Sequence, residues 1–245
     1  MKKKTFFLSV ALGAMALIGC KHQEAVQQDA SIPQVVVENG RFTPEVMWGL
    51  GKMGEVSISP DGKQMVYAVT YYNMEENKGN ADLYLMSVEG GEARRLTTTA
   101  QSESNPAWLD DNTLLFCRDN KIVKFNITSG KESIFATNER GYEGFKLSPD
   151  RSSIVYISTI PVQRPEKLNK LYEGLDKTTG RINEDLMYRH WDQWVDEIPQ
   201  IYLANIKDGK MLTDNVVDIV EGDYECPMRP WGGVEQFNYS PDGKQ

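Results

Sequence analysis

Histidine and cysteine are scarce in this sequence. The 245 residues include two histidines, His22 and His190, and three cysteines, and these residues do not cluster. Because zinc sites in proteins use three or four such ligands held close together, the sequence argues against a zinc site. No pattern in the chain points to another metal or to a cofactor.

An excess of positive charge is also lacking. The formal net charge is −8, and Lys2, Lys3 and Lys4 lie in a terminal segment that we expect to be removed. Loss of these three positive charges takes the net charge from −8 to −11. Nucleic acids are bound mainly through basic surfaces that neutralise phosphates, so this balance argues against nucleic acid as a partner.

Long apolar runs are missing except near the start. Residues 5–18 are apolar, follow the three lysines and lead into Leu17-Ile18-Gly19-Cys20. The run is too short to span a bilayer and has the layout of an export signal. Its ending resembles a bacterial lipobox, which implies cleavage before Cys20 and lipidation of that residue. The alternative is an ordinary signal peptide with a chance cysteine.

The predicted domain boundaries follow from this signal. We expect a lipoprotein signal peptide over residues 1–20, a polar tether over 21–40 and a folded part over 41–245. Lys21 after the cysteine resembles an outer-membrane sorting pattern. The sequence therefore predicts an exported, lipid-anchored protein of the cell envelope, on the periplasmic side of the outer membrane.

Two cysteines remain after the signal peptide, Cys117 and Cys226. An exported protein can form disulfides. Cys117 lies in an apolar, strand-like run, however, and nothing in the sequence places Cys226 beside it. We therefore predict two unpaired, structural thiols.

One hexapeptide recurs along the chain. Ser59–Gln64 and Ser240–Gln245 are identical, and Ser148–Ser153 is a third copy that differs in its second half. The Ser-Pro-Asp-Gly sequence is typical of a tight turn, because Pro sets φ, Asp accepts backbone N–H groups and Gly adopts positive φ. Runs of strand-forming residues, Met65–Val69 and Ile154–Ile157, follow two of the copies.

Strand modules of this kind repeat with a regular period. Tyr67, Phe116 and Tyr156 mark corresponding strands, 49 and 40 residues apart. Repeats of about 40–50 residues with four strands each are typical of β-propeller blades. We therefore predict an all-β fold: a partial β-propeller of about three four-stranded blades plus the start of a fourth. A short helix over Thr43–Trp48 precedes the first blade and packs against it.

The third blade carries a predicted insertion over about residues 161–199. Within it, Asn183–Trp194 has apolar and aromatic residues at helical spacing. This helical face could simply cover the propeller, with His190 as a packing residue. The other interpretation is that Arg189, His190 and Asp192 contact a substrate, because loops of this length in compact repeats are often functional.

A second candidate feature is the segment Asp223–Gly233, which is rich in Pro and Gly. It predicts a rigid loop at the rim of the propeller, where ligand contacts commonly collect. Asp223 and Glu225 are the candidate substrate-binding residues here. The loop could equally be a shaped connector between blades.

Together, several of these motifs resemble one family. The lipobox, Thr43–Trp48, the Ser-Pro-Asp-Gly turns, the insert sequence Leu186–Asp196 and the ending Pro230-Trp231-Gly232-Gly233 resemble bacterial prolyl oligopeptidase family serine peptidases. The likeness is strongest to their dipeptidyl-peptidase and acylaminoacyl-peptidase branch. It implies an N-terminal propeller over a C-terminal α/β-hydrolase domain, with Ser in a Gly-x-Ser-x-Gly elbow followed by Asp and His. This chain contains no Gly-x-Ser-x-Gly, so the hydrolase domain is absent and no catalytic residue can be assigned.

The pattern also predicts a truncated chain. Gln245 closes a turn that leads into a strand in the first copy, and three blades with a stub leave open apolar edges. We expect the segment alone to be inactive and poorly soluble.

The functional prediction is the N-terminal part of a lipid-anchored serine peptidase that releases dipeptides or short N-terminal units from oligopeptides. The propeller would gate substrate access. Its partners would be an oligopeptide, the missing hydrolase domain and, through Cys20, a membrane. The alternatives are a non-catalytic envelope propeller of the Tol type that binds protein or glycan, and a pseudo-peptidase that has lost its serine.

Overall fold

The structure is a computed structural model. It describes residues 32–161, 173–174, 177–180, 195, 197–222 and 224–245. These belong almost entirely to one compact unit, Pro33–Gln245. Within these ranges, no helix has the length and apolar character needed to cross a bilayer.

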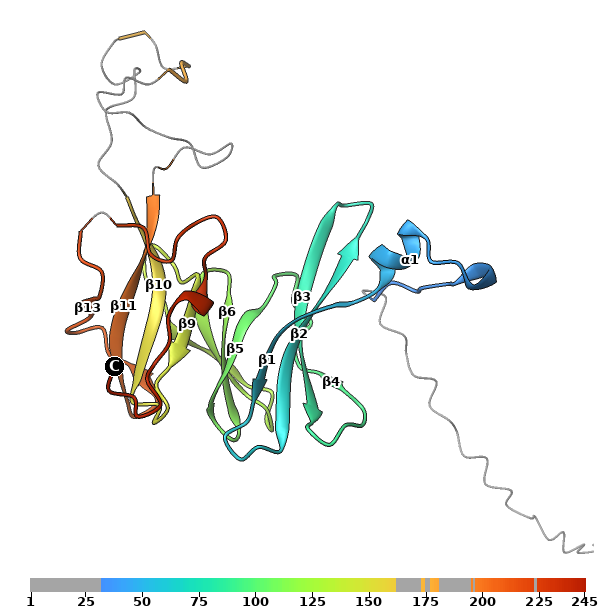
Figure 1. Ribbon diagram of the computed structural model, residues 1–245, viewed down its shortest axis with the longest axis horizontal. Coiled ribbons are helices and arrows are strands. Elements are labelled where there is room, and N and C mark those ends of the chain that lie inside the picture. Colours follow the sequence, from blue (N-terminus) through green and yellow to red (C-terminus); the bar gives the residue numbers. More distant parts are fainter. Residues whose placement is uncertain (1–31, 162–172, 175–176, 181–194, 196, 223) are drawn as a thin grey trace, which may run out of the picture. The chain divides into compact units, whose positions relative to one another are not determined.

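Three antiparallel sheets follow one another along the chain, and we call them blades one, two and three (Figure 1). Blade one contains β1 (Lys52–Ile58), β2 (Gln64–Asn73), β3 (Lys78–Ser87) and β4 (Arg94–Arg95). Blade two contains β5 (Ser104–Asp110), β6 (Thr113–Arg118), β7 (Lys121–Asn126) and β8 (Glu132–Ala136). Blade three contains β9 (Gly144–Leu147), β10 (Ser153–Pro161) and β11 (Glu197–Lys207), and the short strands β12 (Lys210–Met211) and β13 (Val217–Asp218) pair with β11.

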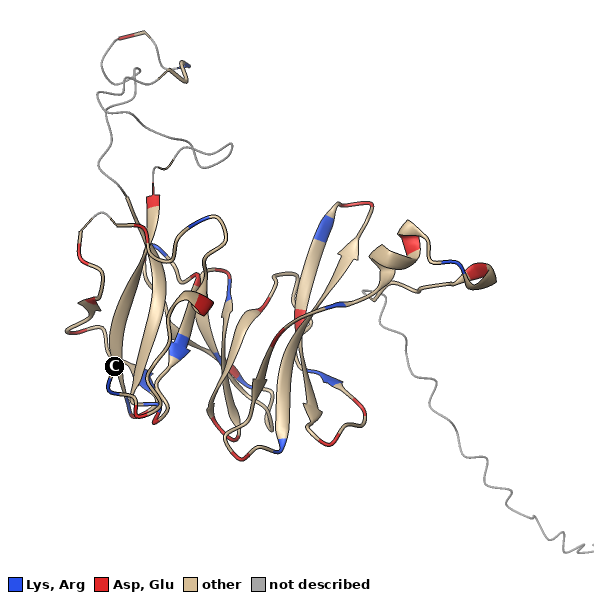
Figure 2. Ribbon diagram, in the orientation of Figure 1, with Lys and Arg blue, Asp and Glu red and all other residues tan. Residues whose placement is uncertain are grey.

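Apart from β13, which pairs with β11, the strands in each blade are neighbours in chain order, as in the blades of a propeller. This arrangement confirms the predicted all-β, partial propeller. A 3₁₀ turn, Val234–Gln236, follows blade three and leads to the last Ser-Pro-Asp-Gly copy. Near it, Lys146 of β9 donates to the carbonyl oxygen of Phe237 at 2.7 Å. Charged residues of both signs lie mainly at strand ends and in loops (Figure 2).

The Ser-Pro-Asp-Gly turns are held by the hydrogen bonds that their sequence predicts. In the first copy the Ser59 hydroxyl donates to Asp61 at 2.7 Å, and the Lys63 N–H donates to the same carboxylate at 3.0 Å. The Gln64 N–H donates back to the Ser59 hydroxyl at 2.9 Å. These bonds favour the ionised carboxylate and lower the pKa of Asp61.

The third copy keeps this turn although it has lost the glycine. Arg151 occupies the glycine position with φ 62°, close to the 71° of Gly62. Its guanidinium donates to the carbonyl of Trp108 at 2.8 Å, which joins the turn to blade two. Hydroxyl and N–H donors from Ser148 and Ser152 lower the pKa of Asp150 to about 2.

The predicted helix is present as α1 (Pro44–Gly49). Thr43 caps it, because its hydroxyl accepts the N–H of Val46 at 3.3 Å. The ring of Trp48 meets Tyr72 of β2 edge-on, with centroids 5.1 Å apart. The helix is thus packed against blade one as expected. A 3₁₀ turn, Glu38–Gly40, precedes it.

Apolar side chains fill the spaces between neighbouring blades. The cluster between blades one and two includes Val66, Leu83, Trp108, Leu114, Phe116, Val123 and Phe125. The cluster between blades two and three includes Leu115, Cys117, Ile122, Phe145, Ile154 and Tyr156. Trp108 is 1% exposed, and its indole N–H donates to the carbonyl of Ser57 in β1 at 3.1 Å. The fold therefore depends on contacts between blades as well as within them.

A buried polar cluster fixes the connection from blade one to blade two. The carboxylate of Glu103 is fully buried and accepts hydrogen bonds from the hydroxyls of Thr97 at 2.7 Å and Thr99 at 2.8 Å. Arg118 of β6 donates to it at 3.2 Å and also contacts Glu132. Burial raises the pKa of Glu103, since desolvation disfavours its charged form.

Both cysteines in the described ranges are free thiols. Cys117 is buried, and burial raises its pKa to about 12. Cys226 is half-buried. The prediction of two unpaired thiols is confirmed.

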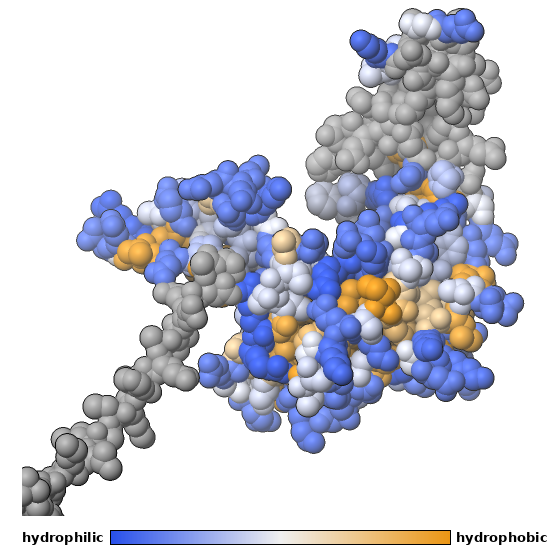
Figure 3. Space-filling model, turned by 180° about the vertical axis from the view of Figure 1, so that it is seen from behind, coloured by the Kyte–Doolittle hydropathy of each residue, from blue (hydrophilic) through white to orange (hydrophobic). Residues whose placement is uncertain are grey.

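Part of blade one is uncovered. Met53, Val56 and Ile58 of β1 are 70%, 49% and 51% exposed. Apolar residues also form several separate patches on the face seen in Figure 3. Within the described residues the three blades do not close into a ring, in agreement with a partial propeller.

Candidate functional site

The loop and the two flanks of the predicted insertion lie at one end of the blades. Strands β9 and β10 are antiparallel, so the start of β9 lies at the same end as the last residues of β10. At that end Pro161 pairs with Glu197 of β11. The insertion therefore leaves and rejoins blade three at the end opposite the Ser-Pro-Asp-Gly turns (Figure 1).

The loop that begins at Tyr224 is bound to this same end. The N–H of Cys226 donates to the carbonyl of Pro199 in β11 at 3.0 Å. Arg229 donates to the carbonyl of Glu197 at 3.5 Å and forms an ion pair of 3.1 Å with Glu143, just before β9. The loop is thus attached to both the first and the third strand of blade three.

Hydrogen bonds within the loop fix its second half. The N–H of Gly232 donates to the carbonyl of Met228 at 2.8 Å, and the N–H of Met228 donates to the side chain of Gln236 at 2.9 Å. A Cβ atom on Gly232 would lie 2.3 Å from that carbonyl oxygen, a separation that no side chain tolerates. Glycine is therefore required at this position.

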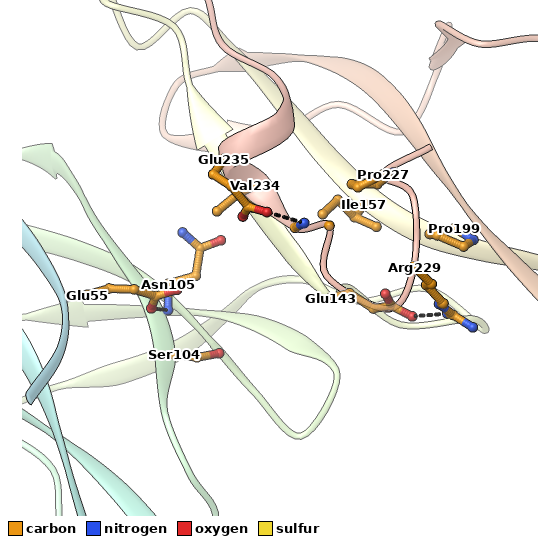
Figure 4. Close-up of a pocket in the computed structure, with 12 residues that line it drawn as sticks. Glu55, Ser104, Asn105, Glu143, Ile157, Pro199, Pro227, Arg229, Val234 and Glu235 are labelled. Atoms are coloured by element: carbon orange, nitrogen blue, oxygen red, sulfur yellow. Dashed lines mark hydrogen bonds and ion pairs between the residues drawn. The ribbon is translucent and has the colours of Figure 1, made fainter. Parts of the chain in front are cut away.

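A cavity of about 190 Å³ lies between this loop and the starts of the innermost strands (Figure 4). Its walls come from β1, β5, β10, β11, the segment before β9, the loop and the 3₁₀ turn. The polar side chains in the wall include Glu55, Asn105, Glu143, Arg229 and Glu235. Three carboxylates and one guanidinium make this wall predominantly acidic.

Several of these polar groups also join neighbouring blades. The N–H of Asn105 in β5 donates to the carboxylate of Glu55 in β1. The N–H of Phe145 in β9 donates in turn to the side-chain oxygen of Asn105. The side chains of Glu55 and Asn105 thus each accept a hydrogen bond from a backbone N–H in the first strand of the next blade. These two bonds set the spacing of the blades at the cavity.

A second cavity, of about 370 Å³, lies between the segment after β8 and blade three. Tyr142, Tyr156 and Tyr202 line it, and Tyr142 and Tyr156 lie edge-to-face with ring centroids 5.0 Å apart. Burial raises the pKa of Tyr156 to about 12, so its phenol stays protonated at neutral pH. Glu225, the one predicted substrate-contact residue that the structure describes, is not among the residues that line this cavity.

The first cavity offers both charged groups and hydrogen-bonding groups. It combines carboxylates, one guanidinium, an amide, a hydroxyl from Ser104 and the backbone of Gly232 and Gly233. Such a mixture suits a polar chain with both donors and acceptors. Within the described ranges, no three His, Cys, Asp or Glu side chains are placed so that they could hold a metal ion.

Of the residues predicted from sequence, the structure places one. Glu225 is half-buried in the loop, two residues before Pro227, which lines the first cavity, and it is not itself among the residues that line this cavity. Arg189, His190, Asp192, Asp223 and the predicted lipidation site Cys20 lie outside the described residues. The structure brings the loop and the two flanks of the insertion together.

Sequence reasoning missed Glu55, Asn105, Glu143 and Glu235. A signal was available for some of them, because Glu55 and Asn105 lie in the first strands of neighbouring blades, 50 residues apart. Aligning the repeats on their first strands would have marked this end of each blade. The partner of Arg229 carries no such signal, since Glu143 is 86 residues away in the chain.

Comparison with known proteins was made by sequence and by structure. No family profile matches the chain. Dipeptidyl-peptidase 5 of Porphyromonas gingivalis is 37% identical over 209 residues, which cover 83% of this chain and 30% of that protein. Dipeptidyl-peptidase 5 of Porphyromonas endodontalis is 28% identical over 229 residues, which cover 88% of this chain and 32% of that protein. This chain therefore spans about a third of the length of these curated relatives.

Solved structures with similar folds include a Pyrococcus horikoshii acylaminoacyl peptidase. It matches with a TM-score of 0.48 and 11% identity, over 68% of this chain and 25% of that one. The names of these two sequence relatives agree with the family resemblance that the motifs along the chain indicate. The chain thus belongs to the prolyl oligopeptidase family of peptidases and corresponds to the N-terminal part of such a protein.

Proposed function

We propose that this chain is the N-terminal propeller segment of a secreted, lipid-anchored serine peptidase that releases dipeptides or short N-terminal units from oligopeptides. The observation that carries the proposal is the 37% identity, over 83% of the chain, to a protein named dipeptidyl-peptidase 5. The nucleophilic serine and its Asp and His partners would lie in a hydrolase domain beyond these residues, because the chain contains no Gly-x-Ser-x-Gly.

The geometry supports a role in substrate access. The loop, the flanks of the insertion and the first cavity lie at one end of the blades. We propose that this end faces the hydrolase domain and that a peptide must pass it to reach the catalytic serine. A propeller in this place would admit short peptides and exclude folded proteins.

The same end supplies candidates for binding the free amino group of a peptide. Glu225 belongs to the loop at the cavity, and we propose that Asp223 of this loop and Arg189, His190 and Asp192 of the insertion share the site. A carboxylate binds an ammonium group by a charge-assisted hydrogen bond, which is stronger where water is partly excluded.

Amide substitutions in the full-length enzyme test this assignment. We expect Glu225→Gln, Asp223→Asn and Asp192→Asn each to raise KM for dipeptide-releasing substrates by roughly tenfold, because a charged hydrogen bond is worth about 1.5–3 kcal/mol. Steady-state kinetics with dipeptidyl aminocoumarin substrates measures the effect. Glu89→Gln, in the exposed turn after β3, is the matched control. Unchanged KM values for all three variants would remove these residues from the site.

The membrane anchor is a separate part of the proposal. We propose that Cys20 carries lipid and holds the protein on the periplasmic side of the outer membrane. In cells that express the full-length protein, Cys20→Ala should abolish incorporation of labelled palmitate and move the protein from the membrane fraction to the soluble fraction. If the variant stays in the membrane fraction and is still labelled, the anchor lies elsewhere.

A further inference from the structure

One side chain connects three segments at the mouth of the first cavity. Arg229 comes from the loop, its ion-pair partner Glu143 lies just before β9, and its carbonyl acceptor Glu197 begins β11. Glu197 is also the residue at which the insertion rejoins the blade. Both Arg229 and Glu143 line the cavity (Figure 4).

At the tip of this loop Pro227 is buried, but the larger apolar side chains are not. Met228 is 65% exposed and Trp231 is 79% exposed, so the apolar side chains on either side of Arg229 lie outside the core. Loops without buried apolar contacts open easily unless polar contacts hold them. The contacts of Arg229 with Glu143 and Glu197 therefore hold this part of the loop together with the N–H hydrogen bonds of Cys226 and Met228.

The ion pair also affects the charge of the cavity. Glu55 and Glu235 already accept backbone N–H groups from Asn105 and Gly233. Glu143 has the Arg229 guanidinium at 3.1 Å. Without that guanidinium the cavity would carry three carboxylates and no cation, and repulsion between them would favour a wider opening.

We infer that Arg229 is a positioning residue. Through its ion pair with Glu143 and its hydrogen bond to the carbonyl of Glu197, it holds the Tyr224–Gly233 loop at the cavity and so determines how tightly short peptides bind there. The inference rests on the proposed function for its effect on peptides. The structural part of the inference, that Arg229 attaches the loop, depends only on the contacts of Arg229 and not on the proposed function.

Hydrogen exchange measured by mass spectrometry tests the attachment in the full-length protein. In Arg229→Ala, peptides covering Cys226, Met228 and Gly232 should exchange about three- to fivefold faster. The expected factor is small because a partly exposed ion pair contributes little free energy to keeping the loop closed. Gly232→Ala should accelerate exchange at least as much, because its Cβ cannot fit. Lys63→Ala removes a cation from an ion pair at the opposite end of blade one and should leave these peptides unchanged.

Charge reversal separates positioning from a general structural effect. The double variant Arg229→Glu with Glu143→Arg keeps an ion pair with its signs exchanged and should restore slow exchange in the loop. Arg229→Lys keeps the charge but not the second hydrogen bond and should fall between wild type and Arg229→Ala. If Arg229→Ala exchanges at the wild-type rate, or the double variant is no slower than either single variant, the inference is wrong.

Kinetics of the full-length protein tests the effect on peptides. Arg229→Ala should raise the KM for dipeptide-releasing substrates about three- to tenfold with kcat within about twofold, the pattern of lost ground-state binding. The double variant should recover most of this loss. An unchanged KM would overturn the role in peptide binding. A wild-type protein that releases no dipeptide would instead overturn the proposed function, while the exchange data would still decide the attachment.

Discussion

Replacing Trp108 with alanine is expected to lower the free energy of unfolding by about 4 kcal/mol, the largest effect among the single substitutions considered. The indole is 1% exposed and lies in the apolar cluster between blades one and two. Its removal leaves a cavity and also leaves the carbonyl of Ser57 without the indole N–H at 3.1 Å. Because the two blades are joined mainly through this cluster, we expect a large loss.

Trp231 is the matched control for Trp108. It is 79% exposed, so Trp231→Ala should change the free energy of unfolding by less than about 0.5 kcal/mol. Urea denaturation of the full-length protein, followed by far-UV circular dichroism at two dilute protein concentrations, measures both variants and reveals any association. Equal effects of the two substitutions would mean that the contact between blades one and two does not carry the stability we assign to it.

Arg118→Leu is expected to cost about 3 kcal/mol, because it leaves a buried carboxylate without its cation. Glu103 would keep its hydrogen bonds from Thr97 and Thr99 but lose the guanidinium of Arg118 at 3.2 Å. Adding Glu103→Gln to this variant removes the uncompensated charge. We therefore expect the double variant to recover most of the lost stability, and a double variant as unstable as Arg118→Leu would contradict the explanation.

The same cluster predicts the sign of a pH dependence. Burial raises the pKa of Glu103 above its ordinary value of 4.5, so the folded state takes up the proton at a higher pH than the unfolded state. Ionised Glu103 therefore costs stability at neutral pH, and this cost shrinks as the pH falls through the folded pKa toward 4.5. In Arg118→Leu the charged form loses its cation, so we expect the defect to become smaller as the pH falls from neutral toward 4.5. Denaturation midpoints across this range test it, and a defect that grows on acidification would exclude Glu103 as its source.

The blades could be predicted from sequence because their signals are local. Each Ser-Pro-Asp-Gly turn contains its own donors and acceptors, as the bonds among Ser59, Asp61 and Gln64 show. Alternation of apolar residues then specifies the strand that follows. Arg151 shows the limit of this reasoning, because it adopts φ 62° in place of glycine and uses a carbonyl of blade two as a partner.

The candidate site could be predicted only in part. The prolines and glycines of residues 223–233 mark the loop, and the long gap between strands marks the insertion. The pairing of Arg229 with Glu143 joins residues 86 apart, and it depends on how the loop returns across blade three. The same is true of the cavity, whose walls come from all three blades. Contacts between residues so far apart in the sequence depend on the packed fold, and no local sequence pattern predicts them.

The most direct test of the proposed function is product analysis. The full-length gene product is incubated with an oligopeptide that has a free amino terminus and with the same peptide acetylated at that end, and mass spectrometry identifies the fragments. We expect successive dipeptides from the free peptide, none from the acetylated peptide, and no cleavage of either by the 245-residue chain. A full-length protein that cleaves neither peptide, or that removes single acetylated residues, would contradict the assignment as a dipeptide-releasing peptidase.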